Sequence, residues 1–379
     1  MVGSGPLTSN ADRRIMNSID VFVINYFSAA DTAQTIRHLG QSLAWKFWVL
    51  DNSQSDHEWQ ELQNHLKPLN SFNIELERAP TNLGFGKACN VLFQRSQAPF
   101  CLLLNPDARL DSVSLQTLHS QLESNPRRAA LAPMMRWLEN ENWWIANMPK
   151  QTWQQNFYLT FIGIHPKLFR FIWQRYYQVQ ITLRHTSDFV EQDFLSGAIL
   201  LIRRSAAIDV ASTPNHLFDE RYFMFFEDTD LSMRLRKGGY HLGIAPQALG
   251  SHCYRHAEHK NSLLSISQKI FAMQWHPKVL SWAFSWLSSI KCPLWLSMNQ
   301  TKVIRSLTEL VAELGEQKLI AWSPSPYRIP AIWRELEAFT ESGFSKTAWD
   351  TLASGRYFAI AIDSNQANPR LTLIAFDKP

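Results

Sequence analysis

The sequence predicts an α/β fold with a doubly wound, mostly parallel sheet, and three observations support this class. Short apolar runs rich in β-branched residues alternate with helix-like segments through the first half of the chain. The run Phe100–Leu104 is apolar at every position, which is typical of a strand buried on both faces of a parallel sheet. Polar residues follow these runs directly, and ligands bind beyond the carboxyl ends of the strands in such sheets.

Composition indicates a folded globular protein of one or two domains. The chain has 379 residues, and a domain takes roughly 150. Apolar residues make up 45% and charged residues 18%, so burial can offset the ordering entropy of the chain. The net charge of +4 is too weak a bias to predict nucleic acid as a partner.

Location is indicated by the cysteines and by apolar segments. The cysteines are dispersed without CxxC spacing, which fits a reducing compartment: Cys89, Cys101, Cys253 and Cys292. Residues 1–19 lack the apolar core of a signal peptide and are expected to form a flexible tail. The most apolar segment, Val279–Ile290, lies between two lysines and is shorter than the ~18 residues of a membrane span. We therefore expect a cytoplasmic protein.

The first elements form a predicted βαβ unit. Val21–Ile24 and Lys46–Leu50 are expected strands, and Asp31 can cap a helix between them. The apolar face of that helix would comprise Ile36, Leu39 and Leu43. Phe72–Leu76 is a third expected strand, and Phe100–Leu104 is a fourth after a helix ending at Arg95.

The remaining chain divides into three parts. Residues 137–192, rich in Trp, Phe, Tyr and Arg, are expected to form a partly helical insertion over the acceptor side of the site. Regular structure resumes with a strand over Gly197–Ile202 and a helix after Glu227, so the main domain would span residues 20–270. Residues 271–379 end in strand-like segments and are predicted to form a smaller α+β domain of unknown role.

The Asn105-Pro106-Asp107 turn follows the buried strand and would project Asp107 from the rigid edge of the sheet. A carboxylate held in this way suits a hard divalent cation. The alternative is an ordinary turn whose side chains bond only to the backbone. The triplet alone does not decide between the two.

Three acids stand at the start of a predicted helix in Glu227-Asp228-Thr229-Asp230. Carboxylates there can satisfy free N–H groups and the helix dipole, which accounts for one or two of them. The preceding run Tyr222–Phe226 is apolar and should bury the acids and shift their proton affinity. This combination favours a functional carboxylate.

Asn82–Asn90 is a glycine turn that opens a helix. Gly84 and Gly86 would permit close approach of phosphate, but Cys89 occupies the third glycine position of a dinucleotide fingerprint, so an oxidoreductase is a remote alternative. His252 follows a strand-like segment, and a lone histidine is more often structural than a ligand.

Six motifs in this order together resemble glycosyltransferase family 2, and more narrowly its bacterial rhamnosyltransferase-like branch. The resemblance covers about Asp20–His256, or two thirds of the chain. The motifs are residues 23–26 (VINY), 49–53 (VLDNS), 82–90 (NLGFGKACN), 103–107 (LLNPD), 196–198 (SGA) and 218–231 (FDERYFMFFEDTDL).

The resemblance implies a GT-A fold, with a Rossmann-like sheet, and inverting transfer of a sugar from a nucleoside diphosphate. Donor-binding residues carried over by motif are Asn25, Asp51, Asn52, Ser53, Asn82, Gly84, Lys87, Asn105 and Gly197. Asp107 would be a ligand of Mn²⁺ or Mg²⁺ and His252 a further ligand, with neutral Asn105 in place of the first acid of the metal motif. Asp228 would be the general base, with Glu227 as second choice, and Asp230 would cap the helix or orient a neighbouring residue.

The resemblance further implies a dTDP- or UDP-sugar donor, with rhamnose favoured, and a glycan or lipid-linked acceptor of surface polysaccharide synthesis such as O-antigen. Lys167–Arg184 interleaves aromatic and basic residues, as an interfacial helix at the inner membrane would, although an exposed amphipathic helix looks the same. Stacking on sugars and core packing are both open for the insertion tryptophans Trp137, Trp143, Trp144, Trp153 and Trp173. The alternative function is a non-catalytic module that binds nucleotide sugars or glycans.

Overall fold

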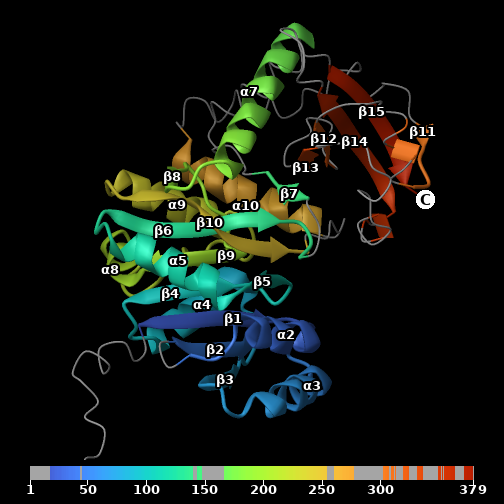
Figure 1. Ribbon diagram of the computed structural model, residues 1–379. Helices are drawn as coiled ribbons and strands as arrows, with labels where there is room; N and C mark the ends of the chain where they lie inside the picture. Colours follow the sequence, from blue (N-terminus) through green and yellow to red (C-terminus); the bar gives the residue numbers. More distant parts are fainter. Residues whose placement is uncertain are drawn as a thin grey trace, which may run out of the picture.

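The computed structural model describes most of the chain, and its described residues form one mixed sheet with helices against it (Figure 1). The described residues are 18–42, 45–139, 143–146, 166–253, 260–276, 302–306, 309–310, 312, 319–323, 331–335, 349–350, 352, 354–362 and 371–378.

The first four strands along one end of the sheet are parallel, in the order β3-β2-β1-β4. They are β1 (Ile19–Asn25), β2 (Trp45–Asp51), β3 (Ile74–Arg78) and β4 (Phe100–Leu104). The β1–β2 register pairs Asn25 with Asp51, so the last residues of the two strands are neighbours. The carboxyl ends of β1, β2 and β4, together with the chain before β9 and α9, are called the site edge below.

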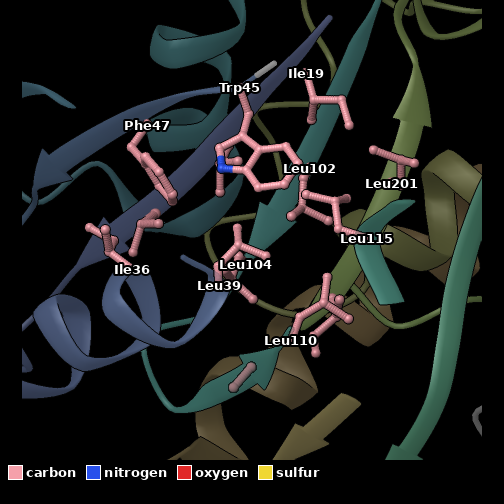
Figure 2. Packing of buried hydrophobic residues seen from close by; sticks show 14 of the residues in the cluster. Ile19, Ile36, Leu39, Trp45, Phe47, Leu102, Leu104, Leu110, Leu115 and Leu201 are labelled. Carbon is pink, nitrogen blue, oxygen red and sulfur yellow. The ribbon is translucent and has the colours of Figure 1, made fainter. Parts of the chain in front are cut away.

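Helices cover both faces of this sheet, because each strand presents alternate apolar side chains to opposite sides. One core contains Val21, Val23 and Leu102, and it packs against α2 (Ala29–Leu39), α3 (Asp56–Leu66) and α5 (Ser112–Glu123). Figure 2 shows residues of this core, with Trp45 and Phe47 of β2 near Ile36 of α2. The second core contains Phe22 and Leu103, and it packs against α4 (Gly84–Arg95), α8 (Arg204–Asp209) and α9 (Glu227–Lys237).

Strand β9 (Ile199–Arg203) runs antiparallel between β4 and β6 (Arg128–Arg136). Ile199 pairs with Leu104, so β9 begins beside the carboxyl end of β4. Strand β10 (His241–His252) pairs with β6 and with the short strands β5 (Ala108–Leu110) and β8 (Val190–Glu191). This direction of β9 brings Gly197 to the site edge.

The C-terminal strands continue the same sheet through the insertion. Strand β13 (Ile332–Glu335) pairs with β7 (Trp144–Ile145), which pairs with β6. The path then runs through β12 (Leu319–Ser323), β14 (Gly355–Ile362), β15 (Leu371–Lys378) and β11 (Lys302–Val303), which lie far from β3 in Figure 1. The other described elements are α7 (Pro166–Arg184), α10 (Lys260–Trp275) and a 3₁₀ turn, η1 (Lys67–Leu69).

The predicted α/β class is confirmed, and local differences from the expected elements have physical causes. Helix α2 begins at Ala29 after the N-cap Ser28, so Asp31 lies in its first turn and is not the cap. Strand β3 begins at Ile74, two residues after the expected Phe72, whose ring packs partly buried against the first core. Residue Leu43 lies outside the described residues. Among the described residues, no helix combines the length and apolarity needed to cross a membrane.

Candidate active site

Asn25 and Asp51 lie side by side at the site edge, completely buried. The Asn25 amide donates to Asp51 Oδ1 at 3.1 Å and to Glu58 Oε1 at 3.0 Å. Glu58, in the first turn of α3, also accepts from the backbone N–H of Ala29 at 2.9 Å. Asn25 is thus held in a hydrogen-bond network that fixes Asp51. The sequence motifs did not include Glu58, although its position three residues after the helix cap Ser55 could have indicated it.

Asp51 keeps one oxygen available at this edge. Its Oδ1 accepts from Asn25 and from the backbone N–H of Ser53 at 3.2 Å. Its Oδ2 accepts no hydrogen bond from the described residues, and Arg78 Nε lies 3.7 Å away. Because a buried carboxylate oxygen without a donor is costly, this atom is a candidate acceptor for a ligand.

Asn52 joins the second loop to the third. Its amide donates to Asn82 Oδ1 at 3.1 Å, and its Oδ1 accepts from the backbone N–H of Leu83 at 2.8 Å. Asn82 Oδ1 also accepts from the N–H of Gly84 at 3.0 Å. The polar residues after β2 and β3 therefore form one connected unit, as their positions predicted.

Contacts within the protein require Gly84 and leave little room for a side chain at Gly86. Gly84 has a φ of +75°, and a Cβ there would lie 2.3 Å from the carbonyl oxygen of Phe223. A Cβ on Gly86 would lie 3.2 Å from the Tyr222 carbonyl oxygen. The exposed Lys87 forms an ion pair of 3.7 Å with Glu220. The glycine turn thus packs closely against the 222–226 loop. The sequence had suggested only that these glycines allow phosphate to approach the backbone.

Asp107 and His252 meet across strands β5 and β10. His252 Nε2 lies 3.2 Å from Asp107 Oδ1, and the side chains are 16% and 44% exposed. The Asp107 carbonyl also accepts from the N–H of Cys253 at 3.1 Å. Arg109 holds the turn by donating to the carbonyl oxygens of Pro106 and Ala108 at 2.7 and 2.8 Å. A carboxylate and an imidazole from residues distant in sequence therefore lie next to each other.

Asp228 is connected to this turn through two adjacent backbone groups. Its Oδ2 accepts from the N–H of Gly197 at 3.0 Å. The next carbonyl, that of Ala198, accepts from the N–H of Asn105 at 2.9 Å. Asp228, Gly197 and Asn105 are thereby gathered on the same edge as Asp107.

Glu227 and Asp228 have different surroundings. Glu227 is 6% exposed, and its Oε2 has no hydrogen-bond partner among the described residues. Burial raises the pKa of Glu227 well above its ordinary value, and the neighbouring Asp228 charge raises it further. Burial also raises the pKa of Asp228, while hydrogen bonds from Gly197 and Thr229 lower it. Burial therefore favours the neutral form of Glu227, whereas the two N–H groups that bond to Asp228 favour its ionised form.

The backbone at the site edge is strained. Phe225 and Phe226 precede α9 with φ of 69° and 67°, and Phe27 and Gln54 follow β1 and β2 with φ of 52° and 62°. Such conformations of residues other than glycine cost about 1–3 kcal/mol each and persist only where the surrounding structure enforces them. Strain of this kind is typical of functional sites.

Asp230 is buried and anchors α9. Its carboxylate accepts from Arg234 Nε at 2.7 Å, from Gln274 Nε2 at 2.8 Å and from Trp275 Nε1 at 2.9 Å. Both oxygens of Asp230 therefore have protein partners, which indicates a structural role for this carboxylate. The bonds from Gln274 and Trp275 also join α9 to α10.

The insertion tryptophans that the structure describes belong to two hydrophobic clusters. Trp143 lies 4.1 Å from Trp322 between ring centroids, and Trp173 stacks at 5.0 Å on Tyr177. One cluster contains Trp137, Trp143 and Trp322, and the other contains Trp144, Trp173, Tyr177 and Trp333; we call the two together the aromatic core. Core packing, and not sugar stacking, explains these tryptophans, while Trp153 lies outside the described residues.

Helix α7 has one buried face and one exposed face. Trp173, Tyr177 and Leu183 are buried, whereas Phe171 and Val179 are 58% and 49% exposed. The amphipathic pattern expected over Lys167–Arg184 is present among the described side chains from Phe171 onward, and their buried face packs on the aromatic core.

A divalent metal fits the Asp107–His252 pair by donor chemistry. Carboxylate oxygen and imidazole nitrogen both suit Mn²⁺, and the carboxylate also suits Mg²⁺. Among the described residues, no group of three or more His, Cys, Asp or Glu side chains could hold a metal ion. The pair would therefore supply only part of a coordination shell, and the rest would come from ligand and water oxygens.

Comparison with solved structures gives distant likenesses. One is the mannosyltransferase PcManGT from Pyrobaculum calidifontis in complex with GDP-Man and Mn²⁺, with a TM-score of 0.45, 11% identity, and coverage of 73% of this chain and 66% of that one. Another is TarS residues 1–349 of S. aureus in complex with UDP-GlcNAc, with a TM-score of 0.44, 15% identity, and coverage of 70% and 67%.

Comparison of sequences is more specific. The chain is 30% identical over 199 residues to the N-acetylglucosaminyl-diphospho-decaprenol L-rhamnosyltransferases of two Mycobacterium tuberculosis strains. The match covers 49% of this chain and spans 60% of the length of those relatives. The model of glycosyl transferase family 2 matches residues 20–210, which is half of the chain and contains most of the site edge. The chain belongs to glycosyl transferase family 2.

Proposed function

We propose that this chain is an inverting, metal-dependent glycosyltransferase that moves a sugar from a nucleoside diphosphate to an acceptor hydroxyl. The observation that carries the proposal is the pair of hydrogen bonds through Gly197 and Ala198, which link Asp228 to the turn that bears Asp107. Inverting transfer needs charge stabilisation at the leaving group and a base on the opposite face of the sugar. The link supports one site containing both.

Asp107 and His252 would hold Mn²⁺ or Mg²⁺. When bound, the ion would neutralise the negative charge that develops on the leaving nucleoside diphosphate. The support is the 3.2 Å separation of a carboxylate and an imidazole, both partly exposed. Asn105, neutral in this chain, would leave the diphosphate itself to contribute further oxygen ligands.

Asp228 would accept the proton of the acceptor hydroxyl. Two N–H groups orient its carboxylate, from Gly197 at 3.0 Å and from Thr229 at 2.7 Å. Because burial raises its pKa, the carboxylate is a stronger base than an exposed aspartate. Transfer should therefore fail as pH falls through the Asp228 pKa, since the protonated acid cannot accept a proton.

The donor and acceptor are proposed by class. Asp51 Oδ2, with no donor among the described residues, would accept from the base or ribose of the nucleotide, and Asn52, Ser53, Asn82, Gly84, Lys87 and Gly197 would line the donor side. The relatives are named as N-acetylglucosaminyl-diphospho-decaprenol L-rhamnosyltransferases, which supports L-rhamnose as the sugar and a lipid-linked or glycan acceptor. We take dTDP-L-rhamnose as the first donor to test. Such an acceptor would suit a cytoplasmic enzyme peripheral to the inner membrane and engaged in surface polysaccharide synthesis.

Nucleotide release tests the proposal and separates it from a non-catalytic binding module. The full chain is incubated with dTDP-L-rhamnose or a UDP-sugar, with Mn²⁺, Mg²⁺ or EDTA, and nucleoside diphosphate is measured. We expect metal-dependent release with one donor, and a rise in Tm with that donor because it binds the folded state. A Tm rise without release for any donor, even with a lipid-diphosphate acceptor, would favour the binding module.

A further inference from the structure

Helix α10 lies beyond the residues matched by the family model and contacts the loop that carries the two strained phenylalanines. Ser267, 2% exposed, donates through Oγ to the Met224 carbonyl at 2.6 Å. The Phe271 ring, also 2% exposed, lies 5.2 Å from the Phe226 ring. Two turns of the helix thus hold consecutive parts of the loop before Glu227.

Gln274 completes these contacts and bridges the loop to α9. Its Oε1 accepts from Tyr222 OH at 3.0 Å and from Arg221 Nη2 at 2.8 Å, while its Nε2 donates to Asp230 Oδ1 at 2.8 Å. One side chain therefore fixes the start of the loop and the first turn of α9 at the same time. Asp228 lies between these two attachment points in the sequence.

The strained backbone needs such support. Phe225 and Phe226 are both left-handed, and residues other than glycine keep that conformation only where their surroundings enforce it. On the opposite side, the Phe223 carbonyl accepts from the N–H of Phe85 at 2.8 Å, next to Gly84. The loop is therefore held between α4 and α10.

We infer that Gln274 and Ser267 of α10 are positioning residues, which set the orientation of Asp228 by holding the 221–226 loop. The inference rests on the proposed role of Asp228 as base. Loss of either contact would let the loop relax toward a less strained backbone and turn the start of α9. The carboxylate of Asp228 would then move relative to Gly197, and misplacement of a catalytic group lowers the rate without removing the group.

Hydrogen exchange tests, without any substrate, whether Gln274 and Ser267 hold the 221–226 loop. In the full-length variants Gln274→Leu and Ser267→Ala, amides of residues 221–228 should exchange about tenfold faster than in the wild type. Gln268→Leu, on the exposed face of the same helix, is the matched control and should leave the exchange unchanged. Exchange at the wild-type rate in both test variants would overturn the inference.

A double-mutant cycle tests the catalytic part, with nucleotide release from dTDP-L-rhamnose and Mn²⁺ as the probe reaction. Gln274→Leu should lower kcat about tenfold, with donor Kd within a few fold, and should cause no further loss in an Asp228→Asn background. An equal loss in both backgrounds would mean a structural effect that does not act through Asp228, and it would overturn the inference. Failure of the base assignment looks different: Asp228→Asn alone would then keep the wild-type rate.

Discussion

Asp51 at the site edge and Trp322 in the aromatic core are buried to the same degree, at 0% and 1% exposure, but they are surrounded differently. Asp51 has one carboxylate oxygen that accepts no hydrogen bond from the described residues. Trp322, whose indole N–H also has no partner among the described residues, packs its ring against Trp137 and Trp143. The site edge also contains the strained residues before α9. Burial of a carboxylate at the site edge therefore costs stability, and burial of aromatic rings in the aromatic core supplies it.

The largest expected effect concerns the aromatic core. Trp322→Ala should lower the free energy of unfolding by about 3–5 kcal/mol, because a large buried ring leaves a cavity between two other tryptophans. Urea denaturation followed by circular dichroism measures it. Val303→Ala, at a 55% exposed position of β11, is the control and should change stability by less than about 0.5 kcal/mol. A small loss in Trp322→Ala would mean that this core does not stabilise the fold.

The second prediction concerns the site edge. Asp228→Asn should lower the rate of transfer about a hundredfold while donor Kd stays within a few fold, since the amide keeps its shape but cannot take a proton. Steady-state kinetics and titration with the donor measure the two effects. Glu123→Gln, on the exposed face of α5, is the control for loss of one acid. More than a tenth of the wild-type rate would rule out Asp228 as the base.

The third prediction concerns the metal. His252→Ala should raise the Mn²⁺ concentration for half-maximal activity about tenfold or more, because a direct ligand is removed. The matched control is His241→Ala, on the same strand, whose ring faces Glu191 at 3.2 Å and is 41% exposed. An identical Mn²⁺ requirement in both variants would exclude His252 as a ligand.

The smallest expected effect concerns the cost of burying Glu227. Burial raises the pKa of Glu227 in the folded state. As pH rises above the ordinary pKa of glutamate, the unfolded chain therefore releases this proton before the folded chain does. The free energy of unfolding of the wild type then falls until pH reaches the folded-state pKa of Glu227. The glutamine of Glu227→Gln cannot ionise. The difference between the Tm of this variant and the Tm of the wild type should therefore increase by about 2 °C, in favour of the variant, from pH 5 to pH 8. Thermal scans measure this, with exposed Glu191→Gln as control. A Tm difference that is the same at both pH values would contradict the buried-acid interpretation.

The elements that the sequence predicted well are those with a local signal. The strand over Phe100–Leu104 was predicted at its observed bounds because five apolar residues in a row suit a strand covered on both faces. The polar residues after the strands met as expected, because parallel strands bring their carboxyl ends to one edge. The neighbours Asn25 and Asp51 are an example.

What the sequence did not reveal depends on contacts between distant segments. Nothing local indicates that β9 runs antiparallel to β4, that Gly84 accommodates the Phe223 carbonyl, or that Gln274 bridges two segments of the site edge. The roles assigned to the site residues and the domain boundary at residue 270 stay predictions.

The pairing of β13 with β7 has a practical consequence for shortened forms of this protein. A chain ended at residue 270 would keep Trp143 and Trp173 but lose the strands bearing Trp322 and Trp333 that bury them. Wide indole surfaces would then face water, and such surfaces promote self-association. We expect the shortened protein to aggregate during purification, even though it retains Asp107, Asp228 and His252.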